Sequence, residues 1–190
     1  YQKALKINRK VNNNLQQAIL LANIATVYDD QKLNVEAYNY SKQAYDIFKS
    51  LQNTRGWSNT VNNLARFSRR LERFKETEAY LKEMKDTADD LNERNYYVQY
   101  YQANATYNND TKKLLEGIKS IDAGIALGDS AEDGAMFGTS YSIKANILYN
   151  LSKYDAALQN YNRAINHFQG MGDRLHLPFA FKGKAEVLSK

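Results

Sequence analysis

The sequence predicts an all-α protein built as an α-solenoid, a stack of antiparallel helix pairs. A chain of 190 residues with one proline and nine glycines has few turn-forming residues for a sheet protein. Alanine recurs every 40 residues, and a large residue precedes each alanine by four positions, on the same face of a helix. The alanines are Ala25, Ala65, Ala105, Ala145 and Ala185, and their large partners are Leu21, Val61, Tyr101, Tyr141 and Phe181.

The alanine and its large partner mark the first helix of each repeat, and a second helix is predicted downstream. Small residues stand 12 and 19 positions after most of the alanines, with mostly larger residues 16 positions after them. Small residues on one helix let the facing helix approach closely, so each repeat is interpreted as a helical hairpin. These positions are Ala37, Thr77, Gly117 and Ala157, then Ser41, Leu81, Ile121 and Tyr161, then Ala44, Met84, Gly124 and Ala164.

The 40-residue period divides the chain into one solenoid with incomplete repeats at both ends. Short polar segments are predicted as hairpin turns, with Asp110 as the N-cap of the helix that follows it. Pro178 fits the first turn of the last helix, where a missing amide donor costs least. We expect the end of a truncated repeat over 1–11, four repeats over 12–51, 52–91, 92–131 and 132–171, and the first helix of a further repeat over 172–190.

These repeats resemble the tetratricopeptide repeat, a 34-residue helix-turn-helix unit. The best match is the stretch in which Tyr141 and Ala145 lead to Tyr154, Ala157, Tyr161 and Ala164. The unit here is six residues longer, which is similar to the extended-helix variety found in bacterial sensory and regulatory proteins. The resemblance implies a right-handed superhelix whose concave wall is built from the first helix of each repeat.

The sequence offers little for catalysis. Cysteine is absent, the only histidines are His167 and His176, and no phosphate-binding, dinucleotide-binding or nucleophile-elbow motif is present. We therefore expect no enzyme activity, no metal and no cofactor. The acidic joint over 129–134 is interpreted as a linker with helix-capping carboxylates, because it lacks the ligand spacing of a calcium loop.

Nucleic acid and membrane are both disfavoured as partners of this segment. The net charge of +5 is modest, and its basic residues are scattered without a groove-reading motif. The longest apolar stretch, Ala18 to Ala25, is far shorter than the roughly 20 residues of a membrane span. A protein or an extended peptide is the partner that remains.

The predicted binding site, here called the inner stripe, consists of polar residues that the resemblance places on the concave wall. Amide side chains both donate and accept hydrogen bonds, so a ladder of them suits the backbone of an extended peptide. Asparagine is abundant throughout the chain, however, so any face would look rich in amides. The inner stripe comprises Asn59, Asn62, Arg66, Arg69, Arg70, Gln99, Gln102, Thr106, Asn109, Ser142, Asn146 and Tyr149.

Three arginines of the inner stripe, Arg66, Arg69 and Arg70, lie within two turns of one helix. Planar guanidinium groups bind carboxylates and phosphates in bidentate fashion, so a partner with an acidic or carboxylate group is one interpretation. The alternative is internal pairing with Glu72, Glu76 or Glu78 across the next turn.

The function predicted from these observations is a non-catalytic recognition scaffold. The long repeats and the incomplete ends favour the sensing region of a larger bacterial signalling protein of the two-component sensor kinase type, with flanking domains. A cytoplasmic peptide-responsive transcription regulator and an assembly scaffold for a multiprotein complex stay open as alternatives. The lack of cysteine is compatible with a periplasmic location, with the cytoplasm as the alternative.

Overall fold

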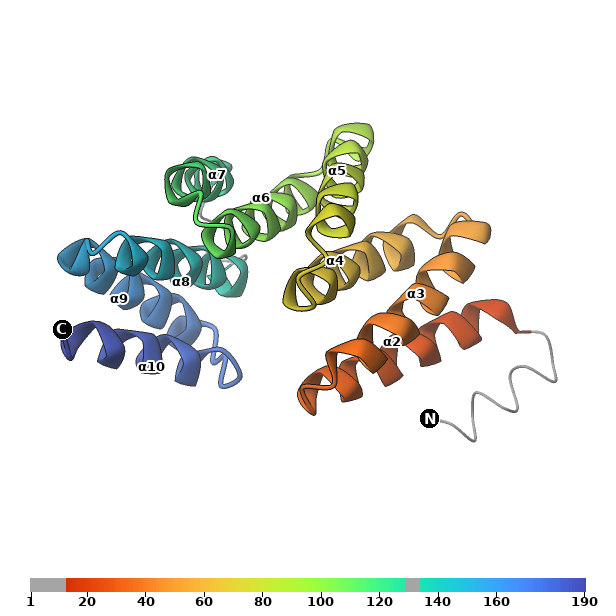
Figure 1. The fold of residues 1–190 in the computed structure, drawn as a ribbon, viewed down its shortest axis with the longest axis horizontal. Coiled ribbons are helices and arrows are strands. Elements are labelled where there is room, and N and C mark those ends of the chain that lie inside the picture. Colours follow the sequence, from red (N-terminus) through yellow and green to blue (C-terminus); the bar gives the residue numbers. More distant parts are fainter. Residues whose placement is uncertain (1–12, 129–133) are drawn as a thin grey trace. The chain divides into compact units, whose positions relative to one another are not determined.

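The computed structural model describes residues 13–128 and 134–190, all of whose regular structure is helical (Figure 1). The predicted repeat end over 1–11 and most of the acidic joint lie outside these ranges, so the interpretations placed there stay predictions. The helices are α2 (Asn14–Asp30), α3 (Asn34–Ser50), α4 (Thr54–Arg70), α5 (Phe74–Leu91), α6 (Arg94–Asp110), α7 (Leu114–Ala126), α8 (Gly134–Asn150), α9 (Tyr154–Gly170) and α10 (Leu177–Leu188).

The helices repeat with the predicted period. The first helices α2, α4, α6 and α8 begin at residues 14, 54, 94 and 134, and the second helices α3, α5, α7 and α9 begin at 34, 74, 114 and 154. Ala25, Ala65, Ala105 and Ala145 are at most 2% exposed, as a close approach of neighbouring helices requires. Ala185 is exposed instead, because α10 packs on its neighbours through another face that carries Ala180, Gly183 and Val187.

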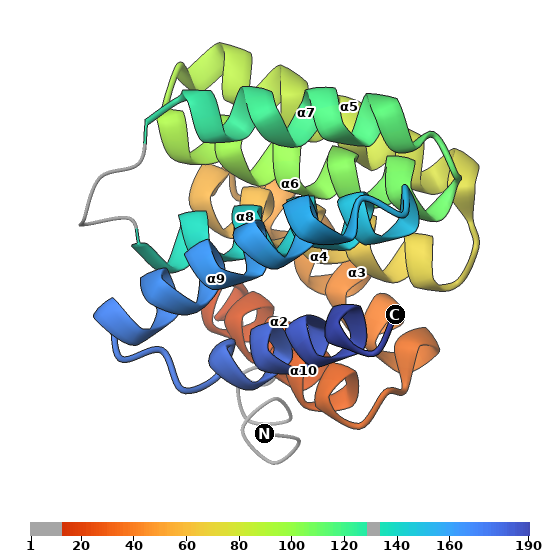
Figure 2. The same ribbon diagram turned by 90° about the vertical axis from the view of Figure 1, so that its left-hand side faces the viewer.

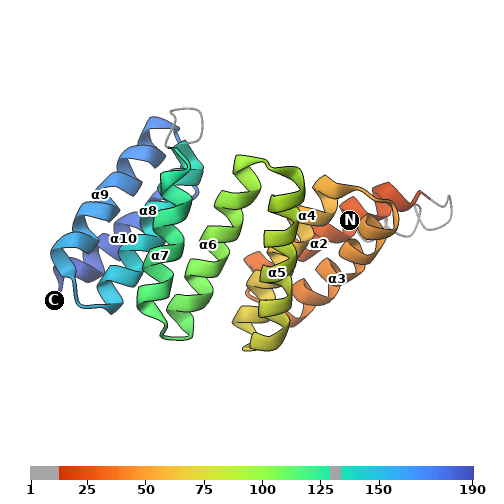
Figure 3. The same cartoon turned by 90° about the horizontal axis from the view of Figure 1, so that it is seen from above.

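The helices form two compact units, which are described separately. The first holds α2 to α5, and the second holds α6 to α10; the division between residues 91 and 92 falls at a predicted repeat boundary. Successive helices inside each unit lie side by side, as Figure 3 shows for α2 to α5 and Figure 2 for α8 to α10.

Each unit has its own core between successive helices. In the first unit, Leu21 of α2 and Phe48 of α3 belong to one buried cluster. In the second, Phe137 of α8, Phe168 of α9 and Ala180 of α10 belong to another. Burying a side chain of this size stabilises the folded state by about 1.5–3 kcal/mol, so these contacts hold each hairpin to the next.

Most hairpin turns and joints contain one residue in the left-handed region. Lys32, Gln52, Glu72, Asn92, Lys112 and Ser152 have φ between 50° and 63°, and Gly172 has φ of 65°. The backbone around several of them forms the Schellman pattern, in which the next amide reaches back five residues. Leu33 N donates to Tyr28 O at 2.9 Å and Lys153 N to Leu148 O at 2.9 Å. In each such turn, backbone amides donate to the last carbonyl groups of the helix, which have no partner within the helix itself.

Two local predictions meet different outcomes. Pro178 lies in the first turn of α10, as predicted. The prediction of Asp110 as an N-cap is wrong, because α6 continues through Asp110 and α7 begins at Leu114 with Lys113 at the cap. The left-handed turn at Lys112 allows this later reversal of the chain. Side-chain caps are found instead at Asn13 and Asn53, whose Oδ1 atoms accept from Gln16 N at 3.0 Å and Gly56 N at 2.8 Å.

Candidate functional site

A hollow of about 340 Å³ lies between α6, α8 and α10 in the second unit. Thr106 and Asn109 of α6 and Asn146 and Tyr149 of α8 belong to the predicted inner stripe, and the structure brings these four together here. Ile143 and Ile147 add apolar surface. The remaining lining residues are Asp110, Asn150 and Glu186.

Hydrogen bonds orient the amide groups of the hollow. Asn150 Nδ2 donates to Asn109 Oδ1 at 2.8 Å, and the hydroxyl of Tyr161 donates to Asn146 Oδ1 at 2.7 Å. Within the described part of the chain, no hydrogen bond uses the amide nitrogens of Asn109 and Asn146 or the amide oxygen of Asn150. The hollow therefore offers two NH₂ groups as donors and one carbonyl as acceptor.

Tyr161 of α9 is held in place by burial and by a glycine of α10. Burial, followed by the negative charge of Glu186 and the neighbouring Tyr149, raises the pKa of the Tyr161 hydroxyl to about 12. The hydroxyl thus keeps its proton at neutral pH and stays a donor to Asn146. Gly183 packs so closely on the Tyr161 ring that a Cβ atom at this position would overlap it. The absent side chain lets α10 approach α9.

The charged groups in the hollow are negative. Asp110 and Glu186 contribute carboxylates, and none of the described residues that line the hollow is Lys, Arg or His. Lys182, one turn before Glu186 on α10, lies 3.8 Å from its carboxylate, with the two side chains 77% and 57% exposed. A pair this long and this exposed contributes little free energy, so it leaves the carboxylate available to another cation.

The other inner-stripe residues of the second unit serve packing or lie outside the hollow. Gln102 Nε2 donates to Met136 O and to Ser140 Oγ, both at 2.8 Å, and so joins α6 to α8. Gln99 is half-buried on α6. The hydroxyl oxygen of Ser142 is buried, with no hydrogen-bond partner among the described residues.

The arginines of α4 lie in the first unit, and two of them pair with a buried carboxylate of α2. Arg66 Nη1 lies 2.8 Å from Asp29 Oδ2, and Arg70 Nη1 contacts Asp29 Oδ1. Asp29 is 8% exposed and is therefore more buried than either arginine. Burial lowers the pKa of Arg66, and Asp29 opposes that shift. Arg69 and Asn62 are half-buried on the same helix, and Asn59 is exposed.

For Arg66 and Arg70, the internal pairing differs from the predicted alternative. Their partner is Asp29 on the preceding hairpin, rather than Glu72 in the following turn or Glu76 or Glu78 on α5. Glu76 instead lies 3.9 Å from Arg73 and accepts a hydrogen bond of 2.6 Å from the Tyr38 hydroxyl.

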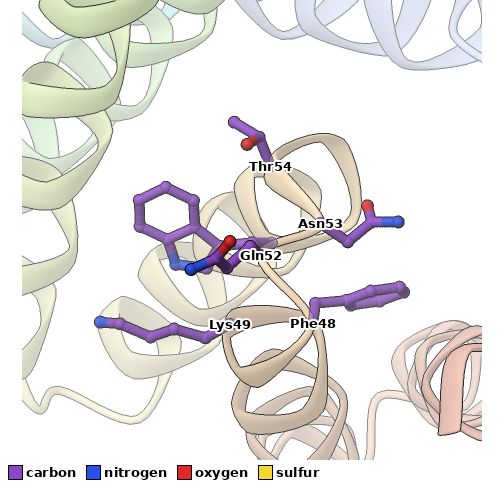
Figure 4. Close-up of a pocket in the computed structure, with 6 residues that line it drawn as sticks. Phe48, Lys49, Gln52, Asn53 and Thr54 are labelled. Carbon is purple, nitrogen blue, oxygen red and sulfur yellow. The ribbon is translucent and has the colours of Figure 1, made fainter.

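A second, smaller hollow of about 220 Å³ lies where α3 turns into α4. Figure 4 shows Phe48 and Lys49 from the end of α3 around it, with Gln52 and Asn53 from the turn and Thr54 at the start of α4. Trp57 also lines it. Its polar neighbours already satisfy one another: Glu83 Oε1 accepts from Trp57 Nε1 at 2.9 Å, from Tyr45 at 2.8 Å and from Lys49 at 3.3 Å.

The sequence contained a signal for Glu186 that the inner stripe did not include. Glu186 directly follows Ala185, as Arg66, Thr106 and Asn146 follow the alanines of earlier repeats. Extending the 40-residue register to the last helix would have found it. The apolar contribution of Ile143 and Ile147 was not predicted, because the stripe was built from polar residues only.

Residues 13–128 and 134–190 contain neither a candidate metal cluster nor a helix that could span a membrane. No cluster of three His, Asp or Glu side chains there is arranged to hold a metal ion. No helix of this part combines the length and the apolar character needed to span a membrane. His176 lies 2.7 Å from Asp173, and the His167 ring stacks on Tyr141 at 5.4 Å.

Comparisons with known proteins identify the fold. No protein-family model matches the chain, and no curated protein matches it in sequence. Among solved structures, aspartyl phosphate phosphatase F from Bacillus subtilis superposes on 99% of the chain with a TM-score of 0.79 at 17% identity. A signal transduction ATPase with numerous domains, which carries a tetratricopeptide repeat sensor and comes from Pyrococcus horikoshii, superposes on 98% of the chain with a TM-score of 0.54 at 16% identity.

The chain thus has the tetratricopeptide-like helical-repeat fold that the sequence predicts. It spans 49% of the Bacillus protein and 34% of the Pyrococcus protein.

Proposed function

We propose that this chain is a non-catalytic scaffold that binds a protein through an extended peptide segment. The observation that carries the proposal is the hollow between α6, α8 and α10, where residues of the predicted inner stripe converge. The amide groups of Asn109, Asn146 and Asn150 there keep hydrogen-bonding atoms that have no partner among the described residues. The similarity of the fold to a protein with a tetratricopeptide repeat sensor supports a recognition role.

The hollow suits a peptide backbone better than it suits a reaction. The amide nitrogens of Asn109 and Asn146 match backbone carbonyl oxygens, and the amide oxygen of Asn150 matches a backbone N–H. Each such bond adds about 0.5–1.5 kcal/mol, and none of them depends on the peptide's side chains. Amides neither take up nor release protons at neutral pH, so the only charged acid-base side chains among the described residues of the lining are the carboxylates of Asp110 and Glu186.

The first test is selection from a library of random peptides displayed on phage. We expect peptides selected on the chain to lose about tenfold or more in affinity for the double variant Asn109→Ala, Asn146→Ala, because two donors are removed. The matched control, Asn162→Ala with Asn166→Ala, removes two exposed amides from α9 and should bind as the unaltered chain does. Equal binding to both variants, with equal thermal stability, would refute the hollow as the site.

An acidic group on the partner is the second part of the proposal and concerns α4. Asp29 shows that the guanidinium groups of Arg66 and Arg70 are arranged to hold a carboxylate. An acidic ligand would exchange with Asp29 or use the outer side of this cluster. Selected peptides that contain Asp or Glu should then lose affinity for Arg66→Gln; if they bind this variant unchanged, this part of the proposal is wrong.

For the biological context, we propose the sensing region of a larger bacterial signalling protein of the two-component sensor kinase type, facing the periplasm. The signalling role of the Pyrococcus structure supports this context at the level of fold. A cytoplasmic regulator and an assembly scaffold are the alternatives.

The membrane side can be tested because the chain lacks cysteine. Gln159→Cys places a single thiol at an exposed position of α9. In intact cells that produce the parent protein, a membrane-impermeant maleimide should label this variant. Labelling only after lysis would place the segment in the cytoplasm and support the regulator instead.

A further inference from the structure

We propose that the hollow between α6, α8 and α10 selects a peptide that places a positively charged side chain, an ammonium or guanidinium group, beside Glu186. This inference deepens the proposed function and rests on it, because it names the chemistry of the bound segment. The carboxylates that line the hollow, the apolar surface beneath them and the position of Glu186 in the repeat register carry the argument.

The local charge of the hollow opposes that of the whole chain. The chain carries a net charge of +5, yet the charged residues lining the hollow, Asp110 and Glu186, are both acidic. A basic peptide has little attraction for the molecule in general and is drawn to this place by the exposed carboxylate of Glu186. A ligand carboxylate brought beside Glu186 would meet a like charge instead.

The carboxylate of Glu186 lies near the oriented amides. Its charge contributes to the raised pKa of Tyr161, whose hydroxyl holds the amide oxygen of Asn146. Asn146 and Glu186 line the same hollow, so a peptide whose carbonyl accepts from the Asn146 amide nitrogen can also place a basic side chain beside Glu186. The competing cation, Lys182, is 77% exposed, and its Nζ lies 3.8 Å from the Glu186 carboxylate. So exposed and distant a pair is weak, and the charged group of a ligand can displace Lys182 at small cost.

The apolar lining fits the stem of a long basic side chain. The accessible apolar surface comes from Ile143, which is half-buried; Ile147 also lines the hollow but is 0% exposed. Lysine and arginine cover apolar surface with their methylene groups while their charged ends stay at a polar rim. Tyr149, whose ring packs against that of Tyr154 at 5.8 Å, adds an aromatic side chain to the same lining.

The repeat register shows that this charge is particular to α10. Arg66, Thr106, Asn146 and Glu186 occupy the same position in successive first helices, directly after the repeat alanine. The same column thus carries a guanidinium group on α4 and a carboxylate on α10. Glu186 is therefore the residue whose substitution should change the charge preference of the second unit.

The test uses three short capped peptides that differ only at the central residue, which is lysine, norleucine or glutamate. Each is titrated into the ¹⁵N-labelled chain, with the side-chain amide signals of Asn109, Asn146 and Asn150 as the readout. We expect the lysine peptide to bind about three- to tenfold more tightly than the norleucine peptide, and the glutamate peptide to bind most weakly. Added salt should reduce the lysine preference.

The variant Glu186→Gln should lower the affinity for the lysine peptide to that for the norleucine peptide, which itself should be unchanged. Glu116→Gln on α7 removes the same charge from an exposed site outside the hollow and should alter neither. The lysine and norleucine peptides could shift the amide signals of the hollow with equal affinities, or the glutamate peptide could bind most tightly. Either result would make the charge inference wrong and leave the binding site standing. If no peptide shifts these amides, the proposed function fails as well.

Discussion

At the scale of single residues, Gly183 determines how the hollow is built. Its missing side chain lets the Tyr161 ring lie against α10, and the Tyr161 hydroxyl in turn fixes the amide of Asn146. The direction in which Asn146 presents its NH₂ group thus depends on a residue of another helix. A small residue at 183 therefore affects both packing and recognition.

The first prediction concerns this contact. Gly183→Ala should lower the free energy of unfolding by about 1–3 kcal/mol, because the added methyl group overlaps the Tyr161 ring. Gly170→Ala, at the end of α9, is the control, since a Cβ there meets no atom within 4 Å. Urea unfolding measures both. A Gly183→Ala variant as stable as its control would show that α10 can move away without cost.

The sequence predicted some residues of the site and missed their partners. Thr106, Asn109, Asn146 and Tyr149 follow from the repeat register, because a fixed period places equivalent residues on equivalent faces. The hydrogen bond between Tyr161 and Asn146 does not follow, because it depends on the crossing of α8 and α9 rather than on spacing. Asp29 was missed as the partner of Arg66 for the same reason: the two lie 37 residues apart, on neighbouring helices.

At the scale of elements, most helices end in a turn of the same conformation. Residues without the freedom of glycine occupy the left-handed position at Lys32, Lys112 and Ser152, while Gly172 occupies it before α10. Such a conformation costs a non-glycine residue about 1 kcal/mol. The scarcity of glycine therefore predicted helices correctly but concealed the nature of the turns.

The second prediction follows from this cost. Ser152→Gly should raise the free energy of unfolding by about 0.5–1 kcal/mol, since relief of the left-handed strain exceeds the extra freedom of the unfolded chain. Gly172→Ser should shift stability in the opposite direction. Thermal unfolding followed by circular dichroism compares the two variants. A loss of stability in Ser152→Gly would contradict the assigned turn conformation.

The third prediction concerns the start of α10. The backbone N–H of His176, with further help from the His176 ring and the Leu175 N–H, lowers the pKa of Asp173 below its ordinary value of 3.8. A carboxyl group whose pKa is lower in the folded state stabilises that state above the ordinary value and loses this effect as pH falls through the lowered pKa. Stability should therefore decrease on acidification below about pH 4.

Asp173→Asn separates the charge from the hydrogen bonds. The asparagine oxygen can still accept from the amides of Leu175 and His176, which Asp173 Oδ1 contacts at 3.0 Å each. The acid sensitivity assigned to Asp173 should disappear in this variant while α10 keeps its first turn. Unfolding curves across the acidic range would show it, and an unchanged pH dependence would assign the effect to other carboxyl groups.

At the scale of the whole molecule, the period of 40 was sufficient to predict the fold class, because each helix packs mainly on its neighbours in sequence. The hollow could not be predicted in the same way. The hollow is lined by residues of α6, α8 and α10 together, and its shape depends on close contacts between helices such as that of Gly183 with Tyr161. Periodicity establishes which face a residue occupies, but not the shape of that face.

The fourth prediction uses this local dependence. Asp29→Asn leaves Arg66 and Arg70 without their buried carboxylate and should cost about 1–3 kcal/mol, less than a fully buried pair because both arginines are partly exposed. Hydrogen exchange should accelerate in α2 and α4 while α8 and α9 keep their protection. The exposed neighbour Asp30 supplies the control Asp30→Asn. Uniform acceleration throughout the chain would contradict local stabilisation.

Among the described residues, left-handed turns with φ between 50° and 65° fall at residues 32, 52, 72, 92, 112, 152 and 172, always a multiple of twenty apart, while Gly128 with φ of 110° lies outside this series. Inside each unit, such a turn reverses the chain between the two helices that it joins, so two successive turns restore its direction. Excising or duplicating a block of forty residues consequently rejoins ends of matching geometry, whereas a block of twenty would exchange inward-facing and outward-facing helices. A stack of such repeats can therefore be lengthened or shortened in whole repeats wherever its junctions share this turn conformation.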